Sequence, residues 1–224
     1  AVATTSQEDE TSPMYPWAEN HLHPLTETPN PSSNVPTLFW HIPKCGGTTV
    51  AYYYGCLELT MVNRAGALPQ FGHEADDELI VFKPWRRHGR PEKYVNVDIT
   101  NKDGIVRAEE MGLVPSGLAD FMISPEPQFA IEHLYDEDHL GRAMGLFRHP
   151  VERLVSKFYY LQVAYWERSY APHWKNMSVL KWAETYNRDN EIMVRKLAGK
   201  RQNEQVGEED LQLAMRTMKE RFVV

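Results

Sequence analysis

The residues from Lys44 to Thr49 have the types and the spacing to bind a phosphate or sulfate group. They follow the apolar run 38–42, which is typical of a strand buried on both faces, and they precede an expected helix. Free backbone N–H groups and the positive end of a helix dipole lie at such a junction and favour an anion there. The candidate contacts are Lys44, Cys45, Gly46, Gly47, Thr48 and Thr49.

Each residue type in this loop has its own chemical use. Gly46 and Gly47 allow the backbone to approach an oxyanion closely, because no side chain intervenes. The two threonine hydroxyls add donors, and Lys44 supplies a mobile positive charge. In a Walker A motif the lysine follows the last glycine, whereas Lys44 precedes both glycines. This order predicts that Lys44 reaches back across the bound anion toward a bond that is being cleaved.

A second junction of the same design occurs over 145–156. Arg148 leaves an expected strand, and Ser156 lies on the polar face of the helix that follows. An arginine and a serine hydroxyl beside a helix N-terminus can bind a phosphate monoester. Surface ion pairs of Glu152 and Arg153 are the alternative interpretation of the charges in this stretch. Two such junctions in one chain predict a ligand with two separate anionic groups.

The elements that must position these loops alternate between strands and helices. This alternation predicts an α/β fold, in which a parallel β-sheet is flanked by helices on both sides. The expected strands cover 38–42, 78–82, 93–99, 119–124 and 143–147. The expected helices cover 48–59, 104–111, 127–135, 150–165, 178–186, 190–197 and 208–221. The clearest of them begins at Pro150, with an apolar stripe of Val151, Leu154, Val155, Phe158, Leu161 and Tyr165.

Composition limits the class of protein further. With 224 residues, 42% of them hydrophobic and 25% charged, the chain has the material for one good core. No apolar run is long enough for a membrane span, so this chain is expected to be soluble. Residues 1–36 are polar and rich in proline, and they predict a flexible leader or stem before one domain over 37–224. The formal net charge of -7 argues against a protein whose whole surface binds nucleic acid or heparin-like polymers, although 83–90 is a local basic segment.

Both loops resemble motifs of one enzyme family. Residues 41–49, HIPKCGGTT, are similar to the 5′-phosphosulfate loop of sulfotransferases that use 3′-phosphoadenosine 5′-phosphosulfate (PAPS). Residues 148–156, RHPVERLVS, resemble the 3′-phosphate site of the same family. The resemblance covers 37–200 and is greatest to the Golgi carbohydrate sulfotransferases, including the heparan-modifying group. It implies a P-loop NTPase-like sulfotransferase fold, with Cys45 where threonine is common and a further C-terminal segment expected beyond Val224.

The resemblance also implies a reaction. A sulfuryl group would pass from PAPS to an acceptor hydroxyl, most commonly on a carbohydrate, with no metal ion. Lys44 would stabilise the charge that develops on the bridging oxygen as the S–O bond breaks. Arg148 and Ser156 would bind the 3′-phosphate, while Asn190 and Arg195 are weaker candidates for the nucleotide pocket.

The acceptor hydroxyl needs a general base, which is usually His or Glu in this family. Glu126 follows a strand end, where active sites of α/β sheets lie. His73 lies in a loop, and His133 is on an expected helix, where it can equally be structural. The sequence leaves the choice among these three open, and His41 is expected to pack.

Two other functions remain open from the sequence. One is a catalytically inactive protein of the same fold that binds PAPS or its product, and the other is a P-loop nucleotide kinase or NTPase. The partners expected from the resemblance are PAPS and a glycan acceptor. The family also implies the Golgi lumen or secretory pathway, with a membrane anchor outside this chain.

Overall fold

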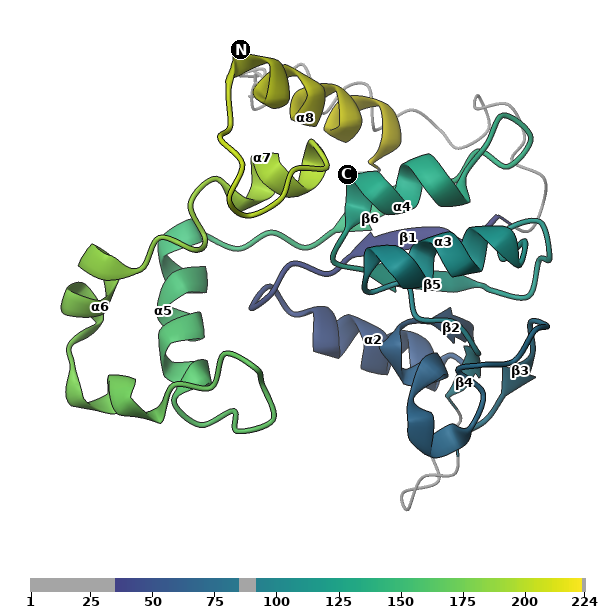
Figure 1. Ribbon diagram of the computed structural model, residues 1–224, viewed down its shortest axis with the longest axis horizontal. Coiled ribbons are helices and arrows are strands. Elements are labelled where there is room, and N and C mark those ends of the chain that lie inside the picture. The colour runs from purple at the N-terminus through teal and green to yellow at the C-terminus, as the bar shows by residue number, and fades with distance from the viewer. Residues whose placement is uncertain (1–34, 85–91, 223–224) are drawn as a thin grey trace, which may run out of the picture.

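A mixed six-stranded sheet forms the centre of the protein, in a computed structural model that describes residues 35–84 and 92–222 (Figure 1). The strand order is β3-β4-β2-β5-β1-β6, and all neighbours are parallel except the antiparallel β3 and β4. The strands are β1 (Thr37–Trp40), β2 (Thr60–Val62), β3 (Val81–Phe82), β4 (Lys93–Val95), β5 (Phe121–Ser124) and β6 (Ala143–Gly145). The predicted α/β class is confirmed, and the predicted parallel pairing is wrong only at the β3 edge.

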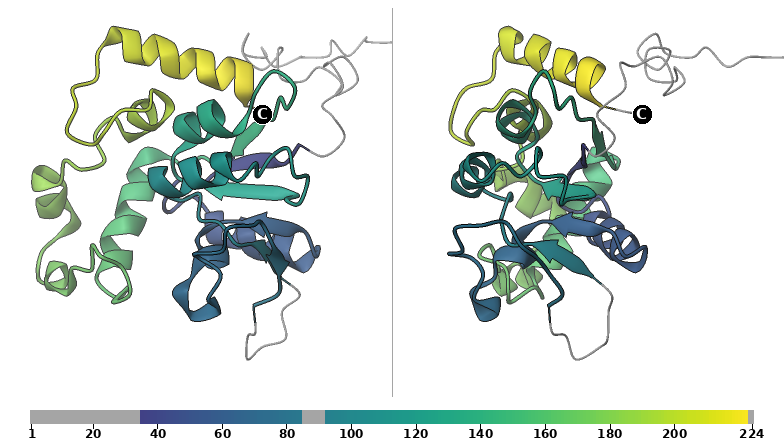
Figure 2. Two further views of the ribbon diagram at one scale, coloured as in Figure 1. Left: turned by 45° about the vertical axis from the view of Figure 1, so that its right-hand side comes forward. Right: turned by 90° about the vertical axis from the view of Figure 1, so that its right-hand side faces the viewer.

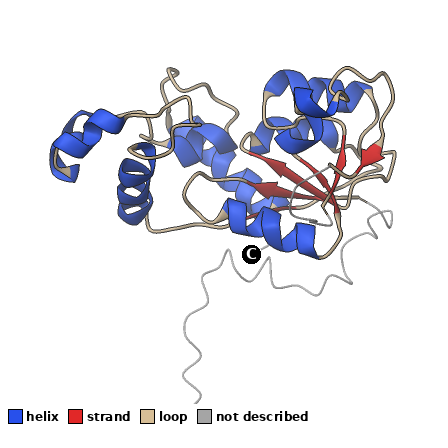
Figure 3. Ribbon diagram, turned by 90° about the horizontal axis from the view of Figure 1, so that it is seen from below, coloured by secondary structure: helices blue, strands red, loops and turns tan. Residues whose placement is uncertain are grey.

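Helices cover both faces of this sheet (Figure 3). They are α2 (Gly47–Cys56), α3 (Lys102–Glu110), α4 (Pro127–Leu134), α5 (Pro150–Leu161), α6 (Val179–Thr185), α7 (Ile192–Leu197) and α8 (Glu208–Arg221). The described residues also form three short 3-10 helices, η1 (Arg64–Ala67), η2 (Pro69–Phe71) and η3 (Pro172–Asn176). None of the helices within the described ranges has the length and apolar character of a membrane span.

The alternation of side chains along β1 divides the core into two parts, because successive strand residues point to opposite faces. Leu38 and Trp40 belong to the larger part, which includes residues of α3, α4, α7 and α8. Phe39 belongs to the smaller part, in which Tyr54 of α2 packs against the sheet. Figure 2 shows α2 on one side of the sheet and α3 on the other. Burial on both faces explains the continuous apolar run that begins at Leu38.

Helices α5 and α6 extend to one side of the sheet (Figure 1). An aromatic cluster joins them, with ring centroids 5.2 Å apart for Phe158 and Trp182 and 4.4 Å apart for Trp182 and Tyr186. The predicted apolar stripe of α5 is wrong in part, since Val151 is 61% exposed and Tyr165, beyond the helix, is 76% exposed. The buried residues of α5 are Arg153, Phe158 and Leu161, so periodicity alone did not identify all of them.

Two further expectations differ from the structure. The three-residue strand β2 was not predicted, because it is too short to show a period and follows directly on α2. β4 ends at Val95, although Val97 and Ile99 beyond it are fully buried. Most of the predicted leader (1–34) and of the basic segment (85–91) lies outside the described residues.

Candidate functional site

The two predicted anion loops lie side by side at the carboxyl edge of the sheet. β1 and β6 are parallel neighbours, with Trp40 opposite Gly145, so the loops that follow them leave the sheet together. The rings of Trp40 and Phe147 meet edge to face, with centroids 5.7 Å apart. Burial raises the pKa of the Cys45 thiol, and the nearby backbone N–H of Arg148 partly offsets that effect. The fold therefore brings two distant stretches of sequence into one site.

The loop between β1 and α2 has an unusual backbone. Lys44 has φ +69° and Gly46 has φ +91°, so both are in the left-handed region. For lysine this conformation costs about 1–2 kcal/mol, and such strain is found most often at functional sites. Gly46 is the N-cap of α2 and provides no side-chain cap, which leaves the start of this helix open to another acceptor.

The side chain of His41 lies directly against Gly47. A Cβ atom added to Gly47 would come within 2.6 Å of His41 Nε2 and would overlap the ring. Burial lowers the pKa of His41, and the negative charge of Glu167 partly opposes this. His41 thus packs, as predicted, and it packs against Gly47 of the anion loop. A side chain at position 47 would clash with the imidazole ring, so this position requires glycine.

We expect Gly47→Ala to lower the free energy of unfolding by about 1–3 kcal/mol, because the new methyl group overpacks the contact with His41. Urea denaturation would measure this loss. Gly145→Ala is the matched control, since a Cβ there would meet only the rings of Phe147, at 3.5 Å, and Phe222, at 3.8 Å, which are ordinary contact distances. Adding His41→Ala to Gly47→Ala should restore most of the stability. Equal stabilities of the two glycine variants would contradict the packing argument.

The ammonium group of Lys44 faces the α5 helix. Its Nζ atom lies 3.5 Å from the centroid of the Tyr160 ring, which is a cation–π contact. Burial lowers the pKa of Lys44, the carboxylate of Glu167 raises it, and the positive charge of Arg148 lowers it further. Lys44 and Arg148 are thus close enough to repel each other, as two cations around one anion would be.

Arg148 lies just before α5, and Ser156 lies in the middle of that helix. Arg148 Nε is 3.3 Å from Glu152 Oε2, and both side chains are largely exposed, so this pair is weak and open to exchange for a ligand. Ser156 is half-buried, and within the described part of the chain no hydrogen bond uses its hydroxyl. Tyr160 lies one turn later on the same face of the helix. Both predicted residues therefore remain available to a ligand beside Lys44.

Arg153 does not form the surface ion pair that the sequence offered as an alternative. Its side chain is buried, and its NH1 atom lies 2.6 Å from Oδ2 of Asp189. Nζ of Lys157 lies 2.6 Å from the other carboxylate oxygen, to which the Tyr186 hydroxyl donates at 3.0 Å. Asp189 therefore anchors the buried side of α5, the helix that carries Ser156.

Of the three candidate bases, Glu126 lies nearest to the two loops by topology. It follows β5, the neighbour of β1, and the backbone N–H of His41 donates to Ser124 O at 2.9 Å. The carboxylate of Glu126 is paired with Lys196 of α7. The structure thus places Glu126 at the same sheet edge as Lys44, although with its charge partly neutralised.

The two candidate histidines lie elsewhere. His73 contacts Asp76 at 3.0 Å and packs on Phe82 of β3, and three strands separate β3 from β1. His133, near the end of α4, contacts Glu109 of α3 at 2.5 Å. That contact joins the packed helices α3 and α4. It lies at the C-terminal end of α4, whereas the N-terminal end of α4 faces the two loops. The structure does not bring either histidine together with Lys44.

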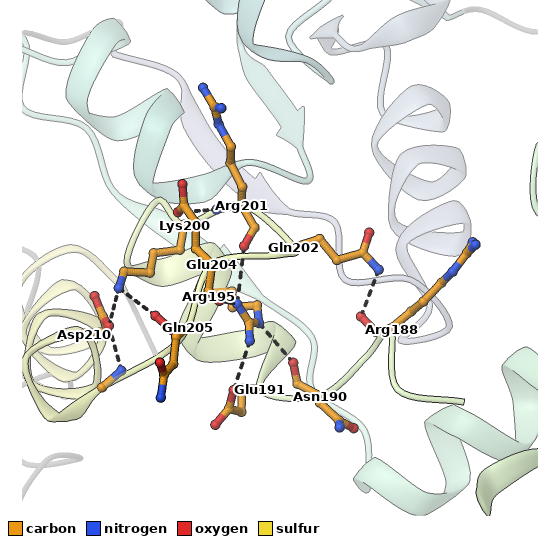
Figure 4. A network of polar contacts seen from close by, with 11 residues as sticks. Arg188, Asn190, Glu191, Arg195, Lys200, Arg201, Gln202, Glu204, Gln205 and Asp210 are labelled. Atoms are coloured by element: carbon orange, nitrogen blue, oxygen red, sulfur yellow. Dashed lines mark hydrogen bonds and ion pairs between the residues drawn. The ribbon is translucent and has the colours of Figure 1, made fainter. Parts of the chain in front are cut away.

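Arg195 is occupied by contacts within its own segment (Figure 4). Its guanidinium donates to the carbonyls of Asn190 at 3.2 Å, Arg201 at 3.3 Å and also Glu204. It also pairs with Glu191 at 3.1 Å. These bonds hold the turn after α7 in place. The network does not bring Arg195 or Asn190 to the two loops.

Two residues of the site had no assigned role from the sequence, Tyr160 and Glu167. The hydroxyl of Tyr160 donates to Glu167 Oε1 at 2.8 Å, and Trp166 Nε1 donates to the same hydroxyl at 3.1 Å. The spacing of four residues between Ser156 and Tyr160 could have placed Tyr160 on the ligand face. No local signal identifies Glu167, because its position depends on how the chain turns after α5.

Within residues 35–84 and 92–222 no group of three His, Cys, Asp or Glu side chains could hold a metal ion. Comparisons of the chain with models of known protein families, with curated proteins and with solved structures found no match. The arrangement of the two loops therefore provides the basis for a functional assignment.

Proposed function

We propose that the chain is a sulfotransferase, which transfers a sulfuryl group from PAPS to an acceptor hydroxyl on a carbohydrate. The observation that carries this proposal is the adjacency of two cation-bearing strand–helix junctions, on the neighbouring strands β1 and β6. A nucleotide with anionic groups at both its 5′ and 3′ positions fits two such junctions. The proposal includes a P-loop NTPase-like sulfotransferase fold for this domain.

The charges of the site fit a ligand of this kind. Burial lowers the pKa of Lys44, and the positive charge of Arg148 lowers it further, so the charges of the two side chains interact. An anion between them would remove their repulsion and would gain charge-assisted hydrogen bonds. The weak, exposed partner of Arg148, Glu152, is the kind of group that a phosphate can displace.

The residues take separate roles in this proposal. PAPS supplies the sulfuryl group together with a leaving oxygen that gains negative charge during transfer. The 44–49 loop binds the phosphosulfate end, and Lys44 is the cation that stabilises the developing charge. Arg148, just before α5, and Ser156, within that helix, bind the 3′-phosphate. Among the described residues, Glu126 at this sheet edge and Glu167 beside Tyr160 are the candidate bases for the acceptor proton.

Titration calorimetry with adenosine 3′,5′-bisphosphate and with 5′-AMP tests the proposal. We expect clear preference for the bisphosphate, because only this nucleotide reaches both junctions. Arg148→Ala should weaken bisphosphate binding by about 10- to 100-fold, the effect of losing one charge-assisted hydrogen bond. Binding of 5′-AMP should change much less.

Arg216→Ala is the matched control, since Arg216 is exposed on α8, away from both loops. It should leave both affinities unchanged. Equal binding of the two nucleotides, or no binding of either, would overturn the sulfotransferase proposal. Magnesium-dependent turnover of ATP would then favour a nucleotide kinase or NTPase.

A further inference from the structure

Tyr160 connects the two halves of the proposed site. It belongs to α5, whose start is proposed to bind the 3′-phosphate, and its ring faces Lys44 of the other loop. The distance of 3.5 Å from Lys44 Nζ to the ring centroid is well inside the range of a cation–π interaction. The lysine is thus held by the helix that would bind the far end of the nucleotide.

The ring of Tyr160 is itself held in place. Its hydroxyl donates to Glu167 at 2.8 Å and accepts from the indole N–H of Trp166 at 3.1 Å. Both partners belong to the turn that follows α5, where Trp166 is 64% exposed. The hydroxyl thus donates one hydrogen bond and accepts another. These two bonds restrain the orientation of the ring, although the ring lies at the surface of the site.

Lys44 needs such a partner because of the charges around it. Its long side chain has many rotamers, and the positive charge of Arg148 repels the ammonium group. The ring face and the nearby carboxylate of Glu167 oppose that repulsion. Together they favour the position of the Lys44 ammonium over the Tyr160 ring.

We propose that Tyr160, oriented by Glu167 and Trp166, is a positioning residue that holds the Lys44 ammonium between the two loops before the nucleotide binds. Its role in sulfuryl transfer rests on the function proposed above. The contact itself does not depend on that function and can be measured in the protein without nucleotide. A pre-positioned lysine avoids ordering a flexible side chain during the reaction.

The contact has a spectroscopic signature. The ε-methylene group of a lysine above an aromatic ring is shifted upfield in an NMR spectrum by the ring current. In a lysine-labelled chain, the Lys44 signal, assigned by its loss in Lys44→Arg, should show this shift. Tyr160→Leu should abolish the shift, while Tyr160→Phe should retain part of it, since the ring remains but its two hydrogen bonds are lost. Tyr159→Leu, the adjacent exposed tyrosine, should leave the shift unchanged.

Kinetics tests the role in transfer. With PAPS and a mixture of desulfated heparan and chondroitin chains, Tyr160→Leu should lower kcat by about 2- to 30-fold, the fold-change that corresponds to one cation–π contact. The affinity for adenosine 3′,5′-bisphosphate should fall by a smaller factor, because Arg148 and Ser156 remain. Tyr160→Phe should fall between the wild type and Tyr160→Leu, and it serves as the test if the leucine variant does not fold.

The outcomes separate this inference from the proposed function. An unshifted Lys44 signal in the wild type, or equal loss of the shift in Tyr159→Leu, would overturn the positioning role even if the bisphosphate binds. Loss of the ring shift without any change in kcat would also overturn it. If the wild type binds no bisphosphate, the proposed function fails, and the role in transfer fails with it.

Discussion

Replacing Asp189 with asparagine should lower the free energy of unfolding by about 3–5 kcal/mol, the effect of removing one partner from a buried ion pair. The side chains of Asp189 and Arg153 are each only 4% exposed, and that of Lys157 is 18% exposed. Asparagine would keep the shape of the side chain but would leave two cations without a counter-charge. Urea denaturation followed by tryptophan fluorescence would measure the loss, because Trp182 lies in the adjoining aromatic cluster.

The same carboxylate predicts a pH dependence of stability. Burial alone would raise the pKa of Asp189, but hydrogen bonds and charges from Lys157 and Arg153 outweigh it, and the pKa lies below its ordinary value. A lowered carboxyl pKa adds stability above the pKa of the unfolded chain, about 3.9. This contribution should be complete at neutral pH and should be lost as the pH falls below about 3.9, through the lower folded value.

Asp103→Asn is the matched control for Asp189→Asn. Asp103 is exposed in the first turn of α3, where the loss of a negative charge should cost only about 0.3–1 kcal/mol. As the pH is lowered into the acid range, the free energy of unfolding should decrease less in Asp189→Asn than in Asp103→Asn. The reason is that only Asp189→Asn lacks the buried carboxylate. Equal stability losses in the two variants would contradict the buried anchor.

The second large effect concerns Lys44. We expect Lys44→Ala to slow sulfuryl transfer from PAPS to glycan chains by about 100- to 1000-fold, comparable to the loss of one donor that stabilises developing charge. The reason is that no other cation lies on the 44–49 loop to replace it. Transfer near the wild-type rate in Lys44→Ala would contradict the proposed role.

Lys44→Gly separates the chemistry of the side chain from the shape of the backbone. At φ +69° glycine avoids the clash that a Cβ atom makes in the left-handed region. We expect Lys44→Gly to be more stable than Lys44→Ala by about 1 kcal/mol and to be equally slow in transfer. Lys219→Ala, on the last turn of α8, is the control for removing a lysine far from the site.

The sequence by itself determined the local parts of the site. The apolar run from Leu38 required a strand buried on both faces, and Pro150 marked the first turn of α5, as the structure confirms. These features depend on neighbours in the chain: a strand needs successive apolar residues, and proline fixes the backbone at a helix start. The glycines of the first loop were likewise identified from residue type alone.

Only the tertiary structure decided how those parts meet. The pairing of β1 with β6, which brings the loops together, depends on the order of strands in the sheet. The local sequence does not encode that order. The periodicity of α5 predicted burial for Val151, but Arg153 is buried because Asp189 supplies its counter-charge from a distant segment. Glu126 and His133 are likewise paired with partners from other helices. The contact of Lys44 with Tyr160 exists because two loops, each predictable alone, leave the same edge of one sheet.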